Sequence, residues 1–326
     1  MKILFRISLA FLVCSFQSAS GQSIKDYGSS GTDMDSLLQI RDSIPLVQVL
    51  LNDTIKDDRR LLKKSHFETS FNYQSNDVYL GRKDSSVLPY FIPEFSYYHK
   101  SGIFVSASLY YLKNQTISRI DLVTIDAGYL FTAGHYEGQF TFSKYFYNSQ
   151  STSVTAALSA SAEYQNSYDL GFIKTTFTGT LNIGKKLDFA GEFGLEHRFS
   201  LIDDKLEVTP TFNVAASTQN FYSDYYKSRR YTIKRKGVAG QTALENISGT
   251  VLNASSFKIL AYESSIPIEY NIGECAISFI PAYSMPVNPA LINIQTTKAN
   301  GAVVNRTRAE QLENTFFWTL GISFLF

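Results

Sequence analysis

The sequence contains little cysteine, tryptophan and charge, and it lacks long apolar runs. Among 326 residues there are two cysteines and one tryptophan, and charged residues make up 18%. Ordinary soluble domains hold roughly 25% charged residues. Beyond residue 16 there is no apolar run of the roughly 18 residues or more that identify a membrane-spanning helix, and the mean hydropathy is near zero. The composition therefore excludes a helical membrane protein and differs from that of a typical soluble domain.

The first 21 residues have the pattern of a cleaved signal peptide. Lys2 and Arg6 provide the positive start of such a peptide. Residues 7–16 are apolar, yet they are too few to span a bilayer as a helix. Small residues precede Gln22, so we expect cleavage before Gln22 and export of the mature chain.

The two cysteines bear on anchoring and on disulfides. Cys14 could anchor a lipoprotein, although Val13 before it is large for that cleavage site and the apolar run continues past it. Cleavage before Gln22 leaves only Cys275, which excludes an intramolecular disulfide. The same cleavage removes two bases and no acids, which leaves 28 basic against 29 acidic residues, a net charge of −1. This balance excludes general polyanion binding but permits local charged patches.

From His66 onward apolar residues alternate with polar ones, most clearly at the C-terminus. One face of this last segment holds Phe316, Trp318, Leu320, Ile322, Phe324 and Phe326. The other face holds Thr315, Thr319, Gly321 and Ser323, and the exceptions to the alternation are Phe317 and Leu325. In a soluble sheet the apolar face would pack on a core. In a barrel in lipid the apolar face points outward, and the polar face lines the lumen.

Twelve segments show this pattern, and each has the roughly 9–11 residues that a tilted strand needs to cross a bilayer. They are 66–75, 88–99, 102–113, 118–130, 135–147, 152–164, 170–182, 188–199, 205–216, 256–270, 275–287 and 314–326. The connections alternate between short turns, at 100–101, 131–134, 165–169, 200–204 and 271–274, and a series that includes the long stretches 76–87, 217–255 and 288–313. Short periplasmic turns and long outer loops are typical of bacterial barrels. The sequence therefore predicts an all-β, transmembrane, antiparallel up-and-down β-barrel of about 12 strands (range 10–14) over residues 66–326.

Together these features resemble the bacterial outer-membrane β-barrel class. The resemblance covers residues 66–326, and its most specific element is the ending 318–326. A terminal aromatic on an alternating last strand is similar to the signal that the barrel insertion machinery reads in this class, which assigns Trp318, Phe324 and Phe326 to assembly. The resemblance implies a porin-like fold in a Gram-negative outer membrane, with the C-terminus in the periplasm, extracellular long loops, and lipids and lipopolysaccharide as contacts. A secreted soluble β-protein is the alternative, but it does not explain an aromatic-rich face on nearly every strand.

Residues 22–65 differ from the predicted barrel. They contain few aromatics and include the charged run 56–60. On the predicted topology they lie in the periplasm, and we interpret them as a tail or a plug. The basic stretch 56–64 could dock among carboxylates of the lumen, or it could remain a hydrated tether.

No motif in the sequence indicates catalysis, a metal or a cofactor, and we expect none of them. Barrels of this class with twelve strands include a phospholipase, and His99 with Ser101 faintly resembles its His-x-Ser pair. That chemistry needs the histidine to deprotonate the serine near the outer leaflet, whereas the predicted topology puts this pair in a periplasmic turn and the expected following Asn is absent. The four histidines His66, His99, His135 and His197 all fall near the periplasmic ends of strands. A metal ring is one interpretation, and tolerance of imidazoles for the half-wet interface is the simpler one.

The predicted lumen face is rich in carboxylates. The inward acidic positions are Glu68, Glu94, Asp126, Glu137, Glu163, Glu192, Glu196, Glu207, Glu263 and Glu269, and the clear inward bases are Lys174 and Arg198. Carboxylates do not stay charged in a dry interior without partners. The lumen is therefore either hydrated or filled by a basic segment, unless these residues are a solvated filling without function.

The predicted connection 217–255 combines bases with aromatics. Its bases include Lys227, Arg229, Arg230, Lys234, Arg235 and Lys236, and Tyr225, Tyr226 and Tyr231 lie between them. On the outer face this stretch could contact the phosphates of lipopolysaccharide, and a solvated hairpin is the alternative. The pattern would also suit nucleic acid, but the compartment argues against that partner.

Three functions fit the sequence, in decreasing order. The first is a channel for small solutes with a mild cation preference from its acidic lumen. The second is a non-conducting structural or surface-interaction barrel whose large extracellular loops bind a partner while the lumen stays blocked. The third is an outer-membrane hydrolase. No fingerprint in the sequence names a substrate or an oligomeric state.

Overall fold

The computed structural model describes residues 64–84, 87–114, 117–223, 231–236, 242–298 and 302–326. The expected signal peptide and nearly all of the expected tail lie outside these residues, and so do Lys227, Arg229 and Arg230 of the basic connection. Lys234, Arg235 and Lys236 belong to a strand.

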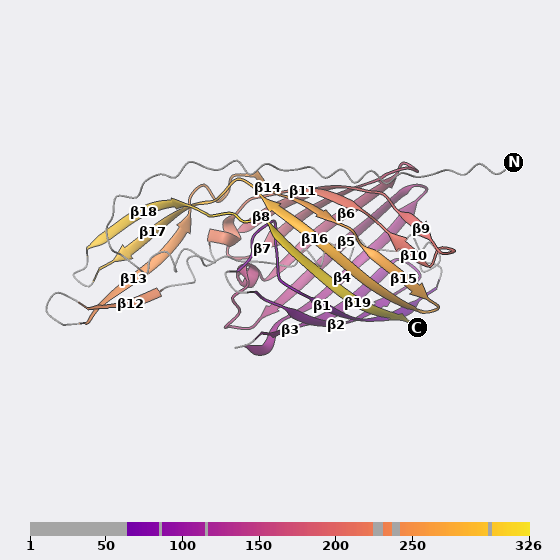
Figure 1. Ribbon diagram of the computed structural model, residues 1–326, viewed down its shortest axis with the longest axis horizontal. Helices are drawn as coiled ribbons and strands as arrows, with labels where there is room; N and C mark the ends of the chain where they lie inside the picture. Colours follow the sequence, from indigo (N-terminus) through magenta and orange to yellow (C-terminus); the bar gives the residue numbers. More distant parts are fainter. Residues whose placement is uncertain (1–63, 85–86, 115–116, 224–230, 237–241, 299–301) are drawn as a thin grey trace.

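The described residues form a closed antiparallel barrel of twelve strands (Figure 1). The ring consists of β1 (His66–Gln74), β2 (Tyr90–Tyr98), β3 (Ile103–Lys113), β4 (Ser118–Ala133), β5 (Tyr136–Tyr147), β6 (Ala160–Asp169), β7 (Lys174–Ile183), β8 (Leu187–Glu196), β11 (Thr211–Ser217), β14 (Lys258–Ser265), β16 (Cys275–Pro286) and β19 (Thr315–Leu325). The ring closes where β1 pairs with β19. The predicted fold class is confirmed.

Three short strands extend the wall near one rim. They are β9 (Phe199–Leu201), β10 (Leu206–Val208) and β15 (Ile268–Ile272), which pair in the order β9, β10, β15, β16. Pro210 separates β10 from β11, and Pro267 separates β14 from β15. Proline has no backbone N–H to donate to a ladder, which explains these interruptions.

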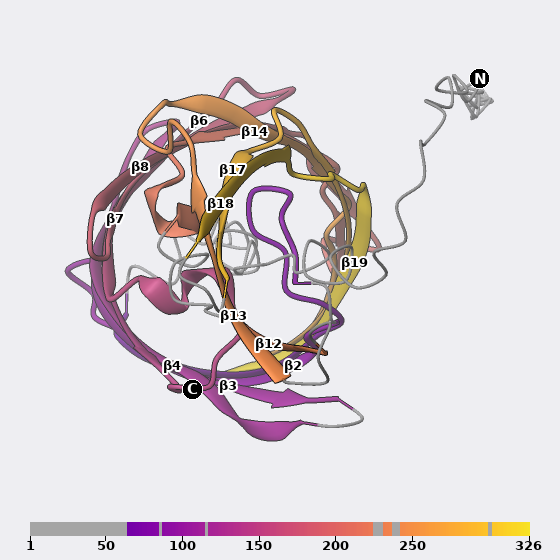
Figure 2. The same ribbon diagram turned by 90° about the vertical axis from the view of Figure 1, so that its left-hand side faces the viewer.

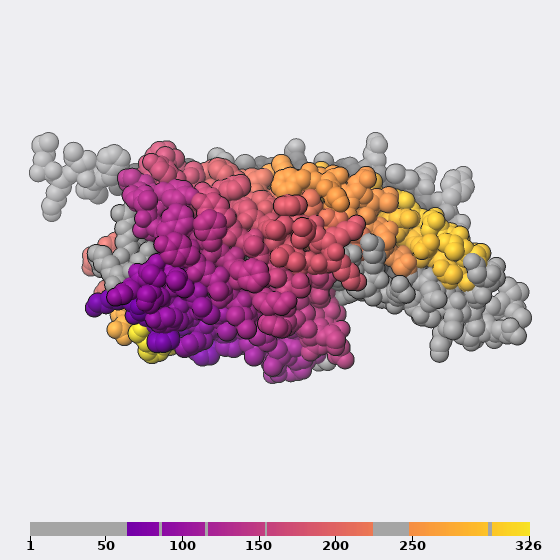
Figure 3. All heavy atoms as spheres, turned by 180° about the vertical axis from the view of Figure 1, so that it is seen from behind, coloured from indigo at the N-terminus to yellow at the C-terminus, as the bar shows by residue number. Residues whose placement is uncertain are grey.

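The outer face of the ring is apolar, and Figure 3 shows the atoms of neighbouring strands forming a continuous outer surface. Large side chains such as Phe71, Phe95, Phe140 and Phe189 stand exposed on it. An apolar surface of this extent marks a membrane or protein contact rather than a face in water. Because these side chains alternate with polar ones that point inward, the wall has the two faces of a transmembrane barrel.

The two rims of the barrel differ. One rim, which we call the turn end, carries the short connections at 99–102, 134–135, 170–173, 202–205 and 273–274, and the C-terminus lies there (Figure 1). The opposite rim, the loop end, carries the connections 75–89, 218–257 and 287–314.

A four-stranded antiparallel sheet stands beyond the loop end (Figure 1). It consists of β12 (Tyr231–Lys236), β13 (Thr242–Val251), β17 (Leu291–Thr297) and β18 (Val303–Ala309), in that order. The two long connections thus form one structure, which we call the loop sheet. The sequence analysis predicted the long connections but not this sheet.

The predicted strand 152–164 is wrong in its first half. Residues 154–157 form the 3₁₀ helix η2 (Val154–Ala157), and β6 then continues through the predicted turn 165–169. The turn lies at 170–173, where Gly171 adopts a φ of 88° that favours glycine. The alternation before β6 looked like a strand because small apolar and hydroxyl residues happen to alternate there. Leu158 instead packs in a buried cluster at the loop end.

The connection 75–89 turns into the ring at the loop end (Figure 2). Its tip is a hairpin turn in which Tyr79 pairs with Arg82, with φ of 49° at Leu80 and 77° at Gly81. Positive φ at both central residues is typical of a type I′ turn. We call residues 76–84 the cap, because they occupy the loop-end half of the lumen.

Three apolar clusters hold the cap and line its surroundings. In the first, Leu80 packs with Leu158, Phe221, Tyr222 and Leu260, among others. In the second, Val78 packs with Ile280, Ala282 and Phe317. The third consists of Leu88, Tyr90, Ile92, Tyr110, Leu112 and Leu122 on neighbouring strands. Phe317, an exception to the alternation of the last strand, therefore points inward because it contacts the cap.

Candidate functional site

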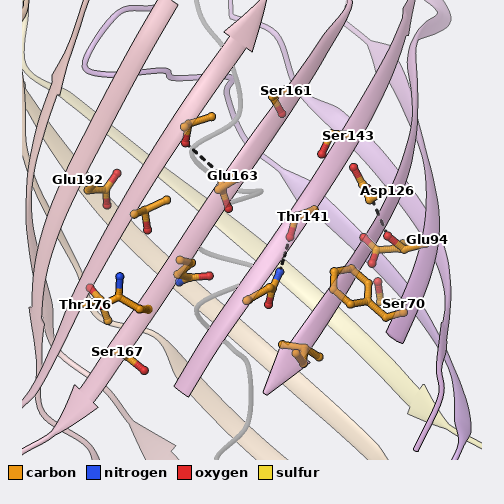
Figure 4. A pocket seen from close by; sticks show the side chains of 18 of the residues that line it. Ser70, Glu94, Asp126, Thr141, Ser143, Ser161, Glu163, Ser167, Thr176 and Glu192 are labelled. Carbon is orange, nitrogen blue, oxygen red and sulfur yellow. Dashed lines mark hydrogen bonds between the residues drawn. The ribbon is translucent and has the colours of Figure 1, made fainter. Parts of the chain in front are cut away.

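The lumen between the cap and the turn end holds a cavity of about 280 Å³. Its walls include Tyr79 and Leu80 of the cap at one extreme, and His66 and Glu137 near the turn end at the other. Figure 4 shows side chains from the surrounding strands pointing into it. Carboxylates and hydroxyls dominate its middle part, and the register of the sheet explains how they are arranged.

Glu94 of β2 lies between hydroxyl residues on both neighbouring strands. It pairs with Ser70 of β1 and Ser108 of β3. Its Oε2 accepts a hydrogen bond from Ser108 Oγ at 3.0 Å, and its Oε1 accepts one from Ser96 Oγ at 3.0 Å. The hydroxyls thus supply part of the solvation that a charged carboxylate loses on leaving water.

Asp126 of β4 repeats this arrangement. It pairs with Ser106 of β3 and Ser143 of β5, and Ser106 Oγ donates to Asp126 Oδ2 at 3.2 Å. The side chain is buried. Asp126 and Glu94 therefore sit on alternate strands in equivalent surroundings (Figure 4).

Glu163 of β6 is the third carboxylate of the series. It pairs with Thr141 of β5 and Thr180 of β7, and Thr180 Oγ1 donates to Glu163 Oε2 at 3.2 Å. We call Glu94, Asp126 and Glu163 the carboxylate belt. The alternate strands β2, β4 and β6 each contribute one acid to it, and the strands beside them contribute hydroxyls.

A second group of charges lies in the same cavity toward the turn end. Lys174 Nζ is 2.8 Å from Glu137 Oε2 and 3.7 Å from Glu196 Oε1. Ser167 Oγ also donates to Glu137 Oε2, at 3.1 Å. Lys174 therefore balances the turn-end acids rather than those of the belt.

The remaining predicted lumen residues divide between the cavity and other places. Glu68, Glu192 and Glu269 line the cavity. Glu207 forms an ion pair with Arg198 at 3.6 Å among the short strands of the turn end. Glu263 is buried next to the cap, where it accepts a hydrogen bond from Ser284 Oγ at 2.8 Å.

The cavity wall changes character next to the cap. Tyr110, Tyr145, Tyr147, Leu122 and Leu158 line it there, together with Tyr79 and Leu80 of the cap itself. The hydroxyls of two of these tyrosines bond to the wall, since Tyr145 OH lies 2.7 Å from Ser161 Oγ and Tyr79 OH accepts from Asn182 Nδ2 at 3.2 Å. The rings are thereby fixed with their apolar surfaces available to the cavity.

Arg82 fixes the cap to β14 and to the connection 287–314. Its guanidinium donates to the carbonyl oxygens of Leu80 and Leu260 at 2.8 and 2.7 Å. It also donates to those of Val287 and Asn288, each at 3.2 Å. The side chain is buried, so these acceptors replace most of its lost hydration.

Glu310 completes this anchor. Its Oε2 lies 3.6 Å from Arg82 Nη2, and both side chains are almost fully buried. Glu310 also accepts hydrogen bonds from Tyr222 OH at 2.7 Å and from the Ala290 backbone N–H at 3.0 Å. Because Ala290 and Glu310 stand at the base of β17 and β18, the cap and the loop sheet are joined through one buried ion pair.

Asp77 and Asp84 are the two acids of the cap, and both are buried. The pKa of Asp77 is shifted. Burial raises the pKa of its carboxyl well above the ordinary value, and the charges of Asp121 and Asp84 raise it further. A hydrogen bond with Ser153 offsets part of this rise. The cap therefore holds the proton of Asp77 more tightly than water does.

The structure places the four histidines at the turn end, at the rim of the wall. His99 Nδ1 lies 2.8 Å from Ser101 Oγ, but it also accepts from the Ser101 backbone N–H, as in a local turn. Among the described residues no group of three or more His, Cys, Asp or Glu side chains could hold a metal ion. The helices in those residues are all too short or too polar to cross a membrane.

The predicted assembly residues lie on the closing strand. Trp318 contacts the ring of Tyr73 at a centroid distance of 5.3 Å and that of Phe279 at 6.1 Å. Phe324 pairs with Thr69 on one side and with Cys275 on the other. Phe326 is exposed, and its backbone N–H donates to the Phe67 carbonyl at 2.9 Å.

Sequence reasoning missed the cap, Arg82 and Glu310. A signal for the cap was present in the strands, because Ile92, Leu112 and Leu122 share the inward face with Glu94, Ser108 and Asp126. Apolar side chains at inward positions near one rim indicate that something apolar fills the lumen there. The pairing of Arg82 with Glu310 leaves no local pattern, since 228 positions separate the two residues.

Comparison with known proteins adds a likeness of fold only. No protein-family model matches the chain, and no curated protein matches it. A chain from a study of in-meso crystallization of membrane proteins is 7% identical, with 80% of this chain and 83% of that chain covered and a TM-score of 0.37. BamA from Haemophilus ducreyi, lacking POTRA domains 1–3, is 9% identical over 80% of this chain and 70% of that chain, with a TM-score of 0.31. A porin is 9% identical over 81% and 99% of the two chains, with a TM-score of 0.28.

The class of the protein follows from its own geometry. A closed antiparallel ring with an apolar outer face and a polar lumen is the architecture of outer-membrane β-barrels. The class-level resemblance drawn from the sequence is confirmed. The similarity to these structures does not indicate what passes through the barrel or binds to it.

Proposed function

We propose that this barrel is a small-solute channel of the bacterial outer membrane, with a mild cation preference, and that the cap closes its loop end. The observation that supports the proposal is the cavity of about 280 Å³ with its belt of carboxylates. A lumen filled only for stability would pair its acids with bases or replace them by apolar side chains. Here the belt acids bond to hydroxyls on their own and neighbouring strands and still face open space.

The proposed orientation puts the turn end in the periplasm and the loop sheet outside the cell. Short periplasmic turns and longer outer loops are the rule in bacterial barrels. The loop sheet then faces the phosphates of lipopolysaccharide, and the expected tail 22–65 lies on the periplasmic side. Solutes meet the cap first when they enter from outside.

A non-conducting surface-interaction barrel is the second candidate, and the packing of the cap favours it. Leu80, Tyr222 and Leu260 are buried together across the loop-end half of the lumen. If this packing never opens, the cavity is a closed cup and the loop sheet carries the function.

Planar-bilayer conductance of two proteins separates these candidates. The first is the full mature chain, and the second has residues 77–84 replaced by a short Gly-Ser linker. The channel proposal expects brief openings in the full chain and larger, steady, ohmic conductance in the linker variant. A silent full chain with a conducting variant supports the surface-interaction barrel, and silence of both folded proteins contradicts the channel.

A further inference from the structure

We propose that the cavity is a binding site for an amphipathic organic cation, in which an ammonium group is attached to an aromatic or short apolar group. The ammonium group contacts the carboxylate belt, and the apolar group lies under the cap. This inference rests on the proposed function, because it names the class of solute that the same lumen takes up. The observation that supports the inference is that an acidic wall and an aromatic wall line the same cavity.

The first wall selects positive charge. Asp126 and Glu163 reach the cavity from β4 and β6 and line it together with the hydroxyl residues that bond to them. A carboxylate has about four lone-pair positions. Hydroxyls of Ser106, Ser143 and Thr124 bond to Asp126, and that of Thr180 bonds to Glu163, so a cation in the cavity adds to these contacts. An anion would face like charges here without a compensating base at the same depth, because Lys174 is engaged by Glu137 and Glu196.

The second wall is aromatic and begins one inward position closer to the cap. Tyr145 follows Ser143 by two residues on β5, and Ser143 pairs with Asp126. Tyr110 stands in the same relation to Ser108, the partner of Glu94. Two residues along a strand correspond to about 7 Å. Ring faces attract organic cations as well as apolar groups, so this wall accepts the part of the ligand next to its charge.

The spacing sets the size of the ligand. A charge at the belt and a ring about 7 Å away match a benzylammonium-like molecule and exceed the reach of a bare inorganic cation. An uncharged aromatic would contact the cap wall but give the carboxylates no cation to bind. The site therefore discriminates by requiring both parts in one molecule.

The test uses the full mature chain, folded in detergent, and benzyltrimethylammonium as the probe. Isothermal titration calorimetry compares this probe with tetramethylammonium, benzyl alcohol and benzoate. The wild-type protein is compared with the double variant Asp126→Asn/Glu163→Gln. The matched control is Glu207→Gln, which removes one acid of the same barrel that lies outside the cavity. Heat-modifiable migration in gels verifies that each variant is folded.

We expect benzyltrimethylammonium to bind at least tenfold more tightly than the other three compounds. The double variant should weaken that binding at least tenfold, and the control should leave it unchanged. Equal binding of tetramethylammonium would contradict the role of the aromatic wall in holding the apolar group. Equal binding of the probe by the double variant would contradict the role of the carboxylates in holding the ammonium group. Because binding is measured without a membrane, a protein that binds the probe but does not conduct would contradict the proposed channel and leave this site standing.

Discussion

At the scale of single residues, the chain treats its buried charges in two ways. The acids of the carboxylate belt bond to hydroxyls and face a cavity, whereas Arg82 and Glu310 pair with each other and bond to backbone groups, with both side chains buried. A buried ion pair is costly to break, because one partner is then left as an unpaired charge. Arg82 and Glu310 therefore hold the cap in place, and the belt remains available to solutes.

Arg82→Ala should loosen the cap strongly. Breaking a buried ion pair costs about 3–5 kcal/mol, and this change also frees the carbonyl acceptors of Leu260 and Val287. We expect frequent openings in planar bilayers and a lower temperature for the heat-modifiable transition. Lys83→Ala is the control, because Lys83 lies 3.8 Å from Glu313 in a largely exposed pair and such pairs contribute about 0–1 kcal/mol. Equal effects of the two changes would contradict the anchoring role of Arg82.

The opening of the cap should depend on pH through Asp77. The folded protein raises the pKa of this carboxyl by burial and by the charges of Asp121 and Asp84. An acid with a raised pKa favours the closed cap while the group is protonated. This contribution is lost as the pH rises from the pKa of the unfolded state to that of the folded state. Tyr90 and Tyr147 face Asp77 from β2 and β5.

Openings should therefore become more frequent as pH increases above the ordinary range of an aspartate. Asp77→Asn should remove that increase, because the amide does not titrate. Open probability at several pH values is the measurement. A steep pH dependence that persists in Asp77→Asn would show that another group controls the cap.

At the scale of elements, the sequence predicted the wall far better than its contents. Strands such as β1, β3, β16 and β19 matched their predicted segments within two residues at each end, because a strand with one face in lipid must alternate. The cap and the loop sheet depend on contacts between distant segments, as between Arg82 and Glu310. Such contacts produce no periodic pattern of apolar and polar residues in the sequence. Near η2 the alternation itself misled, since residues 153–158 alternate without forming part of the wall.

The last strand should be required for assembly. β19 closes the ring between β1 and β16, and Phe326 forms backbone hydrogen bonds with Phe67. Deletion of Phe326 or the change Phe324→Asp should reduce the heat-modifiable protein in outer-membrane fractions. A charge facing lipid costs up to about 2–4 kcal/mol at the midplane for Lys or Arg, and less for Asp or near an interface. Ser323→Ala, on the same strand but the opposite face, should assemble normally, and normal levels of all three would refute the assigned signal.

At the scale of the whole molecule, the barrel has two unlike ends. The loop end carries the cap and the loop sheet, and the turn end carries short connections and the C-terminus. The cavity lies between them, so any solute that crosses must pass both the belt and the cap. The proposed channel therefore has its charged wall and its proposed gate in different halves of one lumen.

Protease added to intact cells should cut the connections 218–257 and 287–314 and spare the turn 202–205. The expectation follows from the proposed orientation, in which the loop sheet is extracellular. Detection uses a C-terminal antibody on blotted outer membranes, with permeabilised cells as the control for cleavage at the inner turn. Cleavage of 202–205 in intact cells would mean that the barrel has the opposite orientation.

If the carboxylate belt gives a conducting lumen a preference for cations, the reversal potential under a salt gradient reveals that preference. The variant without cap residues 77–84 is placed in a bilayer under a tenfold gradient of potassium chloride. We predict a reversal potential of the sign that potassium permeation produces, and its loss in the same variant carrying Glu94→Gln, Asp126→Asn and Glu163→Gln. A potential near zero or of the opposite sign, unchanged by these three substitutions, would contradict the account.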